Sequence, residues 1–485
     1  MQFNFKVIFK ILGILLVLNG VFILLCIPFS LYYKEGDLWA LISSSLITSG
    51  VGGVMLLLTR NNENTELRKR EGYLVVTGGW LVMSFFGALP YILSGSIPDL
   101  TNAFFETLSG FSTTGATILT DIEGVHKGIL LWRSLTQWIG GMGIIVLTVA
   151  ILPILGIGGM QLFVAEAPGI SPDKLQPRIK ETAKRLWLIY LGLTLTEMCL
   201  LWMGGMTFYD AINHALTTMA TGGFSTKNAS IAYYQSPFIQ YVIIFFMFLA
   251  GTNFTMTYFA MKGRFKKVFS NEEFRTYLLV TIFISIVVGL TIFSLENTAF
   301  EKSFREALFQ VVSVVTTTGY ITADYTAWTP FITIIFVMLM FVGASAGSTA
   351  GGVKIVRHLI LIKNSILELK RQIHPSAVLP VRFNSRAVNR DITFNILAFI
   401  MIYISIFALG SIVMGMLGLD FMTSIGAVAT CLGNIGPGIG SVGPVDNFAH
   451  LPNVSKWVLS FLMLLGRLEL FTVLILFTPY FWNKI

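Results

Sequence analysis

The feature that most constrains the fold of this chain is a motif that occurs four times. Each copy is a short, mildly apolar segment that runs into small or hydroxylated residues and a glycine. The closing glycines are Gly115, Gly223, Gly319 and Gly436. They lie about 110 residues apart, much farther than the ~20–50 residues of a solenoid repeat. The pattern therefore predicts four homologous units folded into one body, with the functional site where the units meet.

The composition indicates that these units lie in a lipid bilayer. Hydrophobic residues make up 54% of the chain and charged residues only 12%, too little charge for the surface of a soluble protein of this size. Apolar runs of about twenty residues recur along the chain, as expected for transmembrane helices. The first run ends at Leu31 without a cleavage site, which favours a retained helix over a signal peptide. Cys26, Cys199 and Cys431 lie in separate apolar segments and predict no disulfide.

The positive charge is segregated along the chain. The net charge is +8, but most Lys and Arg lie in the loops 60–70, 174–185, 262–275 and 354–390. The intervening loops 94–127, 204–235, 296–330 and 418–456 are nearly bare of them. This alternation follows the positive-inside rule, so the basic loops and both termini are predicted to be cytoplasmic and no nucleic-acid partner is implied. The basic 354–390 loop is either a docking surface for an acidic patch on a soluble partner or only an orientation signal.

The motif copies divide the chain into an N-terminal unit and four repeats. Residues 1–70 form a two-helix unit, with helices over 7–32 and 38–59. The pore repeats are 71–160, 161–265, 266–375 and 376–485. Each has an incoming span, a short helix, a glycine turn and an outgoing span. The paired spans are 73–94 and 128–156, 184–204 and 237–261, 274–295 and 329–362, and 392–417 and 454–481. This makes about ten spans, and the first short helix, over 102–112, is predicted to begin at Thr101 or Asn102.

The short helices cannot cross a membrane. About ten residues rise only ~15 Å, half of the ~30 Å hydrocarbon core, so each segment must enter the bilayer and turn back. A non-helical turn is tolerated there only when protein or a water-filled cavity surrounds it. The predicted fold is an all-α integral membrane protein, with four tandem helix–pore helix–helix repeats in a pseudo-fourfold arrangement around one pore.

The glycine turns have the chemistry of a filter for a monovalent cation. Rings of backbone carbonyls can replace the hydration shell of a cation, and glycine reaches the required backbone angles without steric cost. No turn contains a carboxylate, so no acidic ring for divalent cations is predicted. A single Ser/Thr-Gly copy would be read as a helix C-cap, but four equivalent copies favour a filter. The candidate K⁺-binding residues are Thr113, Thr114, Gly115, Thr221, Gly222, Gly223, Thr317, Thr318, Gly319, Asn434, Ile435 and Gly436.

Five further runs, added to the four repeats, resemble a known family over essentially the whole chain. They are WIGGMG at 138–143, AILPILG at 150–156, GGFST at 222–226, NIGPG at 434–438 and GRLE at 466–469. The chain is similar to the TrkH type of the Trk/Ktr/HKT superfamily of potassium transporters.

The resemblance implies a potassium-conducting subunit of the bacterial inner membrane, without an organic cofactor. It also implies a homodimer and a cytosolic, nucleotide-binding regulatory partner of the TrkA kind. Plant relatives that transport sodium have serine at the first filter position, so Gly115 favours K⁺.

A glycine run over 343–354 interrupts the long span expected over 329–362. A phosphate-loop reading fails because Val353 stands where the lysine should be and no Ser or Thr follows Lys354. The run is either a flexible kink with close helix packing or a gating loop across the pore, and the resemblance favours the loop. Ala350 departs from the glycine common in the family. The predicted gating residues are Gly343, Gly347, Gly351, Gly352, Lys354 and Arg467.

Arg467 is predicted near the middle of the last span, where a charge costs roughly 2.5–3.5 kcal/mol and usually marks function. Our hypothesis is that it hydrogen-bonds carbonyls of the 343–352 loop and holds the loop closed. The alternative is an arginine that snorkels or lies at a dimer interface. Lys354 either takes part in the gate or ends its span at the lipid headgroups.

Three function classes remain to be compared. The leading one is a gated, channel-like K⁺ uptake protein. A proton- or sodium-coupled symporter would be expected to have a titratable group in the ion path, for which Glu197 is the only remote candidate. An intramembrane enzyme is not expected, because no paired catalytic motif is present, and the scattered histidines predict no metal site.

Overall fold

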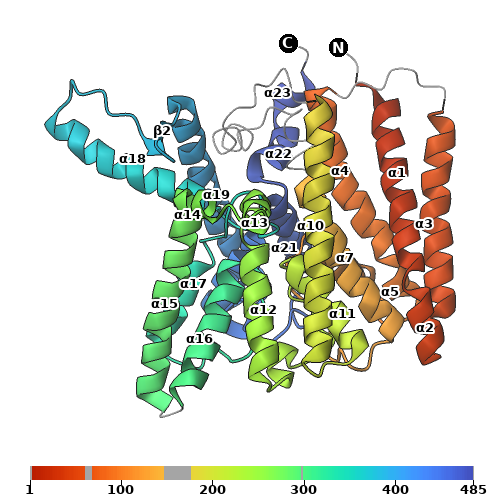
Figure 1. The fold of residues 1–485 in the computed structure, drawn as a ribbon. Coiled ribbons are helices and arrows are strands. Elements are labelled where there is room, and N and C mark those ends of the chain that lie inside the picture. Colours follow the sequence, from red (N-terminus) through yellow and green to blue (C-terminus); the bar gives the residue numbers. More distant parts are fainter. Residues whose placement is uncertain (1–2, 61–67, 147–175, 297–298, 484–485) are drawn as a thin grey trace.

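The computed structural model describes residues 3–60, 68–146, 176–296 and 299–483, and this part of the chain is almost entirely helical (Figure 1). Its one sheet is a short antiparallel pair, β1 (Arg382–Phe383) and β2 (Arg386–Ala387). The end of the helix expected over 128–156 lies outside the described residues.

The N-terminal unit stands beside the repeats, with α1 and α3 side by side at the right-hand edge of Figure 1. It consists of α1 (Phe5–Leu24), α2 (Ile27–Tyr33) and α3 (Leu38–Leu58). A Cβ atom added to Gly52 would lie 2.7 Å from the carbonyl oxygen of Gly13, so the two backbones are in close contact. Small residues commonly allow such approach between helices in membranes. The two expected N-terminal spans are present, and the first is divided into α1 and α2.

The four repeats follow in chain order, each with one short helix between longer segments. The first has α4 (Lys69–Gly87), α5 (Leu89–Leu93), α6 (Leu100–Phe111) and α7 (Lys127–Val146). The second has α10 (Gln176–Met203), α11 (Phe208–Met219), α12 (Pro237–Ala250) and α13 (Phe254–Met261). The third, preceded by α14 (Phe265–Ser270), has α15 (Glu272–Glu296), α16 (Phe300–Val315), α17 (Pro330–Leu339) and α18 (Ile355–Ile373). The fourth has α19 (Arg390–Met416), α20 (Phe421–Gly433), α21 (Asn453–Arg467), α22 (Leu470–Leu474) and α23 (Pro479–Trp482).

The short helices α6, α11, α16 and α20 are the expected half-helices, and their starts follow from local capping. The side chain of Asp99 accepts a hydrogen bond from the backbone N–H of Asn102 and begins α6. Thr207 and Asp420 do the same for α11 and α20. The prediction that α6 begins at Thr101 or Asn102 is wrong, because Asp99 supplies the capping oxygen two or three residues earlier.

Three outgoing segments are not the continuous helices that we expected. Among the described residues, six helices are long and apolar enough to span a membrane, or eight if each of two bent pairs counts as one span. Segment 237–261 is bent by 112° between α12 and α13, and segment 454–481 by 117° after Arg467. Segment 329–362 is divided into α17 and α18. Asn253 explains the first break by capping α13, and Glu469 has a left-handed φ of 63° at the second.

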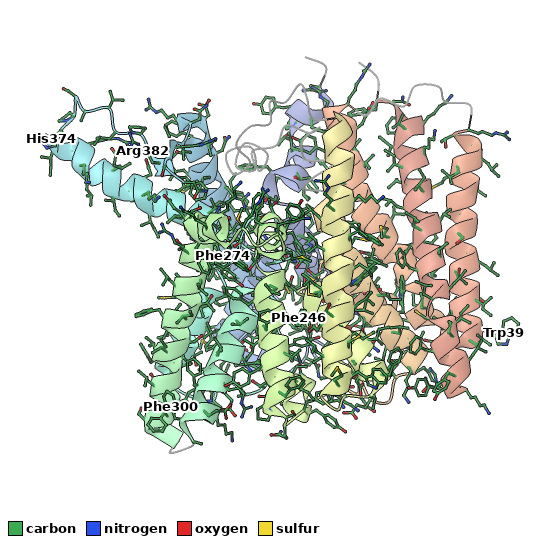
Figure 2. All side chains as sticks on the ribbon, viewed as in Figure 1. Trp39, Phe246, Phe274, Phe300, His374 and Arg382 are labelled. Atoms are coloured by element: carbon green, nitrogen blue, oxygen red, sulfur yellow. The ribbon has the colours of Figure 1, made fainter. Side chains whose placement is uncertain are left out.

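The lateral surface of the bundle is apolar. Trp39 and Phe300 are exposed at this surface, whereas Phe246 is buried inside it (Figure 2). A wide apolar surface of this kind is expected to face lipid. The amphipathic α18 instead projects away from the bundle, at the end of the molecule where both termini lie (Figure 1).

Candidate functional site

The four half-helices end in the same way. The backbone N–H groups of Thr114, Gly222, Thr318 and Ile435 each donate to the carbonyl oxygen five residues earlier, at distances from 2.8 to 3.0 Å. This is the longer of the two hydrogen bonds of the Schellman ending, in which the chain reverses at a left-handed residue. Four homologous segments therefore leave their helices along one common path.

The backbone angles confirm that the four turns are copies of one another. The left-handed residue at each helix end has φ of 53° at Thr113, 55° at Thr221, 56° at Thr317 and 54° at Asn434. Two residues later, each closing glycine also has positive φ: 81° at Gly115, 73° at Gly223, 79° at Gly319 and 104° at Gly436. The glycine is therefore not the helix cap itself. Threonine in the left-handed region is strained, and strain of this kind tends to collect at functional sites.

The four closing glycines pack against one another's turns in a closed ring. A Cβ atom added to Gly115 would lie 2.2 Å from the carbonyl oxygen of Gly222, and one on Gly223 would lie 1.9 Å from that of Thr318. In the same way, a Cβ atom added to Gly319 would lie 2.0 Å from the carbonyl oxygen of Ile435, and one on Gly436 would lie 2.9 Å from that of Thr114. Each repeat thus contacts the next, and the fourth returns to the first. These contacts join the closing glycine of each turn to the residue before the closing glycine of the next.

This ring has the chemistry expected for a monovalent cation. Its turns contain main-chain carbonyls, hydroxyl groups and one carboxamide, and no carboxylate. The C-terminal ends of all four half-helices lead into it, so their dipoles add partial negative charge on that side. Carbonyl oxygens in such a ring can replace water around an ion. No group of three or more His, Cys, Asp or Glu side chains that could hold a metal occurs within the described ranges.

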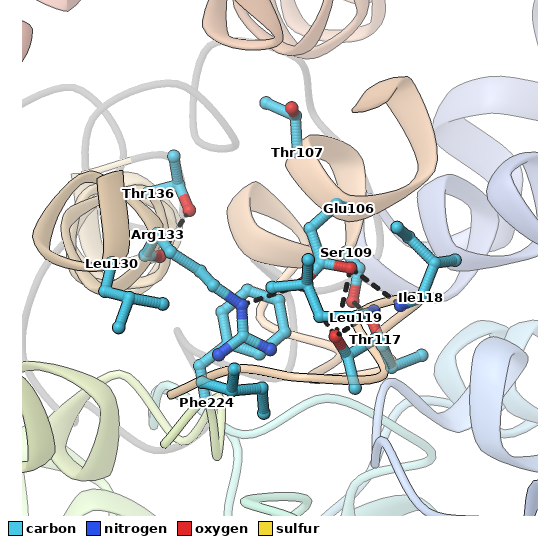
Figure 3. Close-up of polar contacts among 12 residues, drawn as sticks. Glu106, Thr107, Ser109, Thr117, Ile118, Leu119, Leu130, Arg133, Thr136 and Phe224 are labelled. Carbon is cyan, nitrogen blue, oxygen red and sulfur yellow. Dashed lines mark hydrogen bonds and ion pairs between the residues drawn. The ribbon is translucent and has the colours of Figure 1, made fainter. Parts of the chain in front are cut away.

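A buried ion pair between Arg133 and Glu106 lies beside the segments that follow the first two turns (Figure 3). Arg133 in α7 donates from Nε to Glu106 Oε1 in α6 at 2.7 Å. The Glu106 carboxylate also accepts from the backbone N–H of Ile118, at 2.8 Å. The Arg133 guanidinium donates to Ser225 O at 3.0 Å and lies 3.5 Å from the ring centre of Phe224. The pair therefore joins the segments that follow the first and second turns.

The glycine-run loop over 343–354 lies directly against the ring. The backbone N–H of Gly351 donates to the hydroxyl of Thr317, a candidate filter residue, at 2.7 Å. The Thr349 hydroxyl donates to Met219 O at the end of α11, at 3.0 Å. A Cβ atom on Gly351 would lie 2.7 Å from Gly433 O. The loop therefore contacts the second, third and fourth repeats at the ends of their half-helices.

The other predicted glycines shape this loop. Gly343 donates to Val353 O at 2.8 Å and so closes the loop at its base. Gly347 and Gly352 have left-handed φ of 71° and 64°. Gly347 O accepts from the N–H of Phe254, at the start of α13, at 3.2 Å. The break between α12 and α13 thus provides part of the loop's support.

Arg467 makes the hydrogen bond that we expected. It is 3% exposed, and it donates from Nη1 to Thr349 O at 2.7 Å and from Nη2 to Gly140 O at 3.0 Å. It lies at the last residue of α21, where the helix breaks. The arginine therefore bridges the loop to the first repeat, and its role in gating stays a prediction.

The two neighbouring charged residues also contact this region. Glu469 pairs with Arg357 at the start of α18, not with Arg467. The ammonium group of Lys354 donates to the carbonyl oxygens of Ala350 and Gly351. It turns onto its own loop, which disfavours the alternative in which it reaches lipid headgroups.

Glu197 does not belong to the ring. It is fully buried in α10, beside Thr218 of α11. One of the scattered histidines, His214 in α11, hydrogen-bonds Asp210 O and the Ser225 hydroxyl at 2.7 and 2.9 Å, so it is a polar contact inside the second repeat.

The chain is similar to known transport proteins along its whole length. Residues 40–484 match the family model described as TrkH, cation transport protein. Proteins called Trk system potassium uptake protein TrkH, from Escherichia coli and Salmonella typhimurium, are each 40% identical to it over 99% of this chain and 100% of their own. The crystal structure of the potassium transporter TrkH from Vibrio parahaemolyticus superposes with a TM-score of 0.91 at 36% identity, covering 99% of this chain and 100% of that one.

Proposed function

Since the chain belongs to the TrkH family of cation transport proteins, we propose that it carries potassium ions across a bacterial membrane through the ring of its four glycine turns. The closed cycle of glycine-to-carbonyl contacts is the observation that carries this proposal. Backbone carbonyls held in such a cycle provide fixed oxygen ligands for a dehydrated monovalent ion.

Uptake through this pore needs no coupling ion. A cation that moves inward down the membrane potential gains about 2.3 kcal/mol per 100 mV, which supports roughly fiftyfold accumulation. The second candidate is proton- or sodium-coupled symport on the same fold, and the buried carboxyl of Glu197 is the observation in its favour.

Flux into proteoliposomes separates these two mechanisms. With an imposed potential and no proton or sodium gradient, the channel-like protein takes up K⁺, and Glu197→Gln leaves that uptake unchanged. A strict requirement for a proton or sodium gradient would refute the channel mechanism. Absence of K⁺ uptake under every gradient would refute potassium transport itself. Paired K⁺ and Na⁺ solutions in the same assay give the selectivity.

We infer that the loop over 343–354 is the gate. The position of the loop against Thr317 and the ends of the half-helices supports this role. Four long-range contacts at the loop and its C-terminal end also support it: Arg467 to Thr349 O, Glu469 to Arg357, Gly351 N–H to the Thr317 hydroxyl, and Phe254 N–H to Gly347 O. Two cationic groups, Arg467 and Lys354, bind carbonyl oxygens there. A pore that contains fixed positive charge beside its filter opposes the passage of a cation.

Removing the arginine tests the gate. Arg467→Ala removes the hydrogen bonds to Thr349 O and Gly140 O that bridge the loop to the first repeat, so we expect a higher K⁺ flux from the protein alone. Arg467→Lys keeps the charge but cannot donate to two carbonyls with one planar group, and we expect an intermediate flux. Unchanged flux in Arg467→Ala would refute the latch.

The positive-inside alternation supports a bacterial inner-membrane location with cytoplasmic termini. Both termini and α18 lie at one end of the molecule (Figure 1), as this orientation requires. Labelling of a single cysteine introduced near either terminus, in spheroplasts and in inverted vesicles, tests the assignment.

Partners are expected at this same end. The exposed face of α18 has a stripe of large apolar side chains at helical spacing: Ile362, Ile366, Leu369 and Ile373. Such an unpartnered stripe supports a second copy of the chain in a homodimer. The basic character of 354–390 supports docking of a cytosolic, nucleotide-binding TrkA-like subunit. Leu369→Glu is expected to shift the purified protein from dimer to monomer in light scattering.

A further inference from the structure

The four filter turns are held by different side chains, although their backbones are alike. In the first repeat, the hydroxyl groups of Ser112 and Thr114 are hydrogen-bonded at 2.7 Å. In the third repeat, Thr316 and Thr318 make the equivalent bond at 2.8 Å. Each pair ties the middle residue of the turn to the end of its own half-helix. We call this pair the hydroxyl brace.

The second repeat has no hydroxyl brace. At the two equivalent positions it has Ala220 and Gly222, so it lacks both oxygen atoms. The middle residue of this turn is also a glycine, which is the most flexible choice for an unbraced segment. The fourth repeat also lacks the brace, since it has Gly433 and Ile435 at these positions. Its turn is held instead by its own Asn434, whose carboxamide donates to Thr114 Oγ1 and Met463 O, both at 2.9 Å.

A glutamine from the first repeat occupies the vacant space. Gln137 of α7 is fully buried. Its Nε2 donates to Gly222 O at 2.6 Å and its Oε1 accepts from the N–H of Phe224 at 3.1 Å. A Cβ atom on Gly222 would lie only 2.3 Å from Gln137 Cδ. The carboxamide therefore fits against Gly222 because that residue has no side chain, and it holds the turn on both sides of Gly223.

The polar side chain is not demanded by helix packing. Gly140 of α7 and Gly466 of α21 occupy equivalent places, because a Cβ atom on each would lie 1.9 and 2.1 Å from the carbonyl oxygens of Phe111 and Leu432. The residue three positions earlier is Gln137 in the first case and Met463 in the second. An outgoing helix thus packs well with methionine three residues before this glycine. The glutamine occurs in α7, which lies against the second turn, and that turn lacks the hydroxyl brace.

We propose that Gln137 is a positioning residue that sets the ion selectivity of the pore by bracing the second filter turn. The proposal rests on potassium transport through the ring. Discrimination between K⁺ and Na⁺ depends on how firmly the carbonyl oxygens of all four turns keep their distance from the ion, whereas passage itself requires only that the ring stay open. Loss of the carboxamide therefore weakens selectivity more than it weakens flux.

The test compares permeation of K⁺ and Na⁺ in proteoliposomes. Gln137→Met keeps the size of the side chain and uses the residue of the fourth repeat, but it removes both hydrogen bonds. We expect the K⁺/Na⁺ permeation ratio to fall by at least about fivefold, the factor of one lost hydrogen bond, while Na⁺ flux rises. Gln240→Met is the matched control, because Gln240 is a buried glutamine of α12 that also makes two hydrogen bonds. Its carboxamide donates to Tyr234 O at 2.9 Å and accepts from Arg305, outside the filter.

A transplanted brace provides the second arm. The triple variant Gln137→Ala, Ala220→Ser, Gly222→Thr removes the carboxamide and installs the hydroxyl brace of the first repeat. We expect it to recover a K⁺/Na⁺ ratio within about twofold of the wild type. If Gln137→Met fails to assemble, the K⁺/Na⁺ ratio of the triple variant tests the proposal by itself.

Two outcomes overturn the proposal: a wild-type ratio in folded Gln137→Met, or an unselective triple variant that assembles normally. A wild-type protein that conducts no K⁺ would instead refute the proposed function.

Discussion

The ring of glycines makes a prediction that separates backbone strain from lost packing. Gly223 and Gly95 have nearly the same left-handed φ, 73° and 74°. A Cβ atom on Gly223 would lie 1.9 Å from Thr318 O, whereas nothing lies within 4 Å of one on Gly95. Alanine at either position carries the same backbone cost, roughly 1–2 kcal/mol. Only Gly223→Ala also forces the next repeat to move.

The size of that movement follows from the contact. Carbon and oxygen atoms in close contact are about 3.3 Å apart, so Thr318 O and the added methyl group must separate by roughly 1.4 Å. Functional sites tolerate displacements of only about 0.5 Å. We therefore expect Gly223→Ala to abolish selective K⁺ flux, with each ~1.4 kcal/mol of strain beyond the backbone cost lowering the intact population about tenfold.

The assay is K⁺ flux in proteoliposomes, beside thermal unfolding of the same preparations. We expect Gly95→Ala to lose stability by the backbone cost alone and to conduct like the wild type. Equal flux from Gly223→Ala and Gly95→Ala would show that the glycine is needed only for its φ, and the inter-repeat ring would then not be the filter.

Three further changes test other parts of the structure. Arg133→Leu leaves the buried Glu106 charge unpaired and should cost about 3–5 kcal/mol in unfolding free energy, while the double variant with Glu106→Leu should recover much of it. Asp420→Ala removes the cap of α20 and should cost roughly 0.5–2 kcal/mol, seen in thermal unfolding. Hydrogen bonds from Thr423 hold the pKa of Asp420 below its usual range. The stability that the ionised Asp420 contributes is therefore present at neutral pH and is lost as the pH falls through that lowered pKa. Asp420→Ala should accordingly reduce the loss of unfolding free energy that acid causes. Glu469→Gln should raise basal K⁺ flux by freeing Arg357 at the start of α18.

The repeats could be predicted from sequence because their signal is local and repeated. The half-helices are predicted because their apolar segments are too short to span the bilayer, and the glycines at 115, 223, 319 and 436 indicate the turns. The left-handed residues before them could not be foreseen, since threonine is normally disfavoured in that conformation. Their conformation is imposed by the helix ending and by the neighbouring repeat.

The contacts across repeats were harder to predict. Gln137 and Gly222 are eighty-five residues apart along the chain, and neither is unusual in its own segment. A comparison of the repeats offers the only signal, because Ala220 and Gly222 lack the hydroxyl groups found at the equivalent positions of the first and third. Arg467 was easier to single out, since a charge in an apolar run is conspicuous. Its two acceptors, Thr349 O and Gly140 O, required the fold.

The ring is built from one polypeptide, and this has a consequence for how such a pore can evolve. In a tetramer of identical subunits, every substitution enters the filter four times at once. Here a change at Gly222 or Asn434 alters one quarter of the ring and leaves the other three as they are. Each quarter of the ring can therefore change separately, and the glutamine against one turn and the asparagine in another are differences that a tetramer of identical subunits could not have.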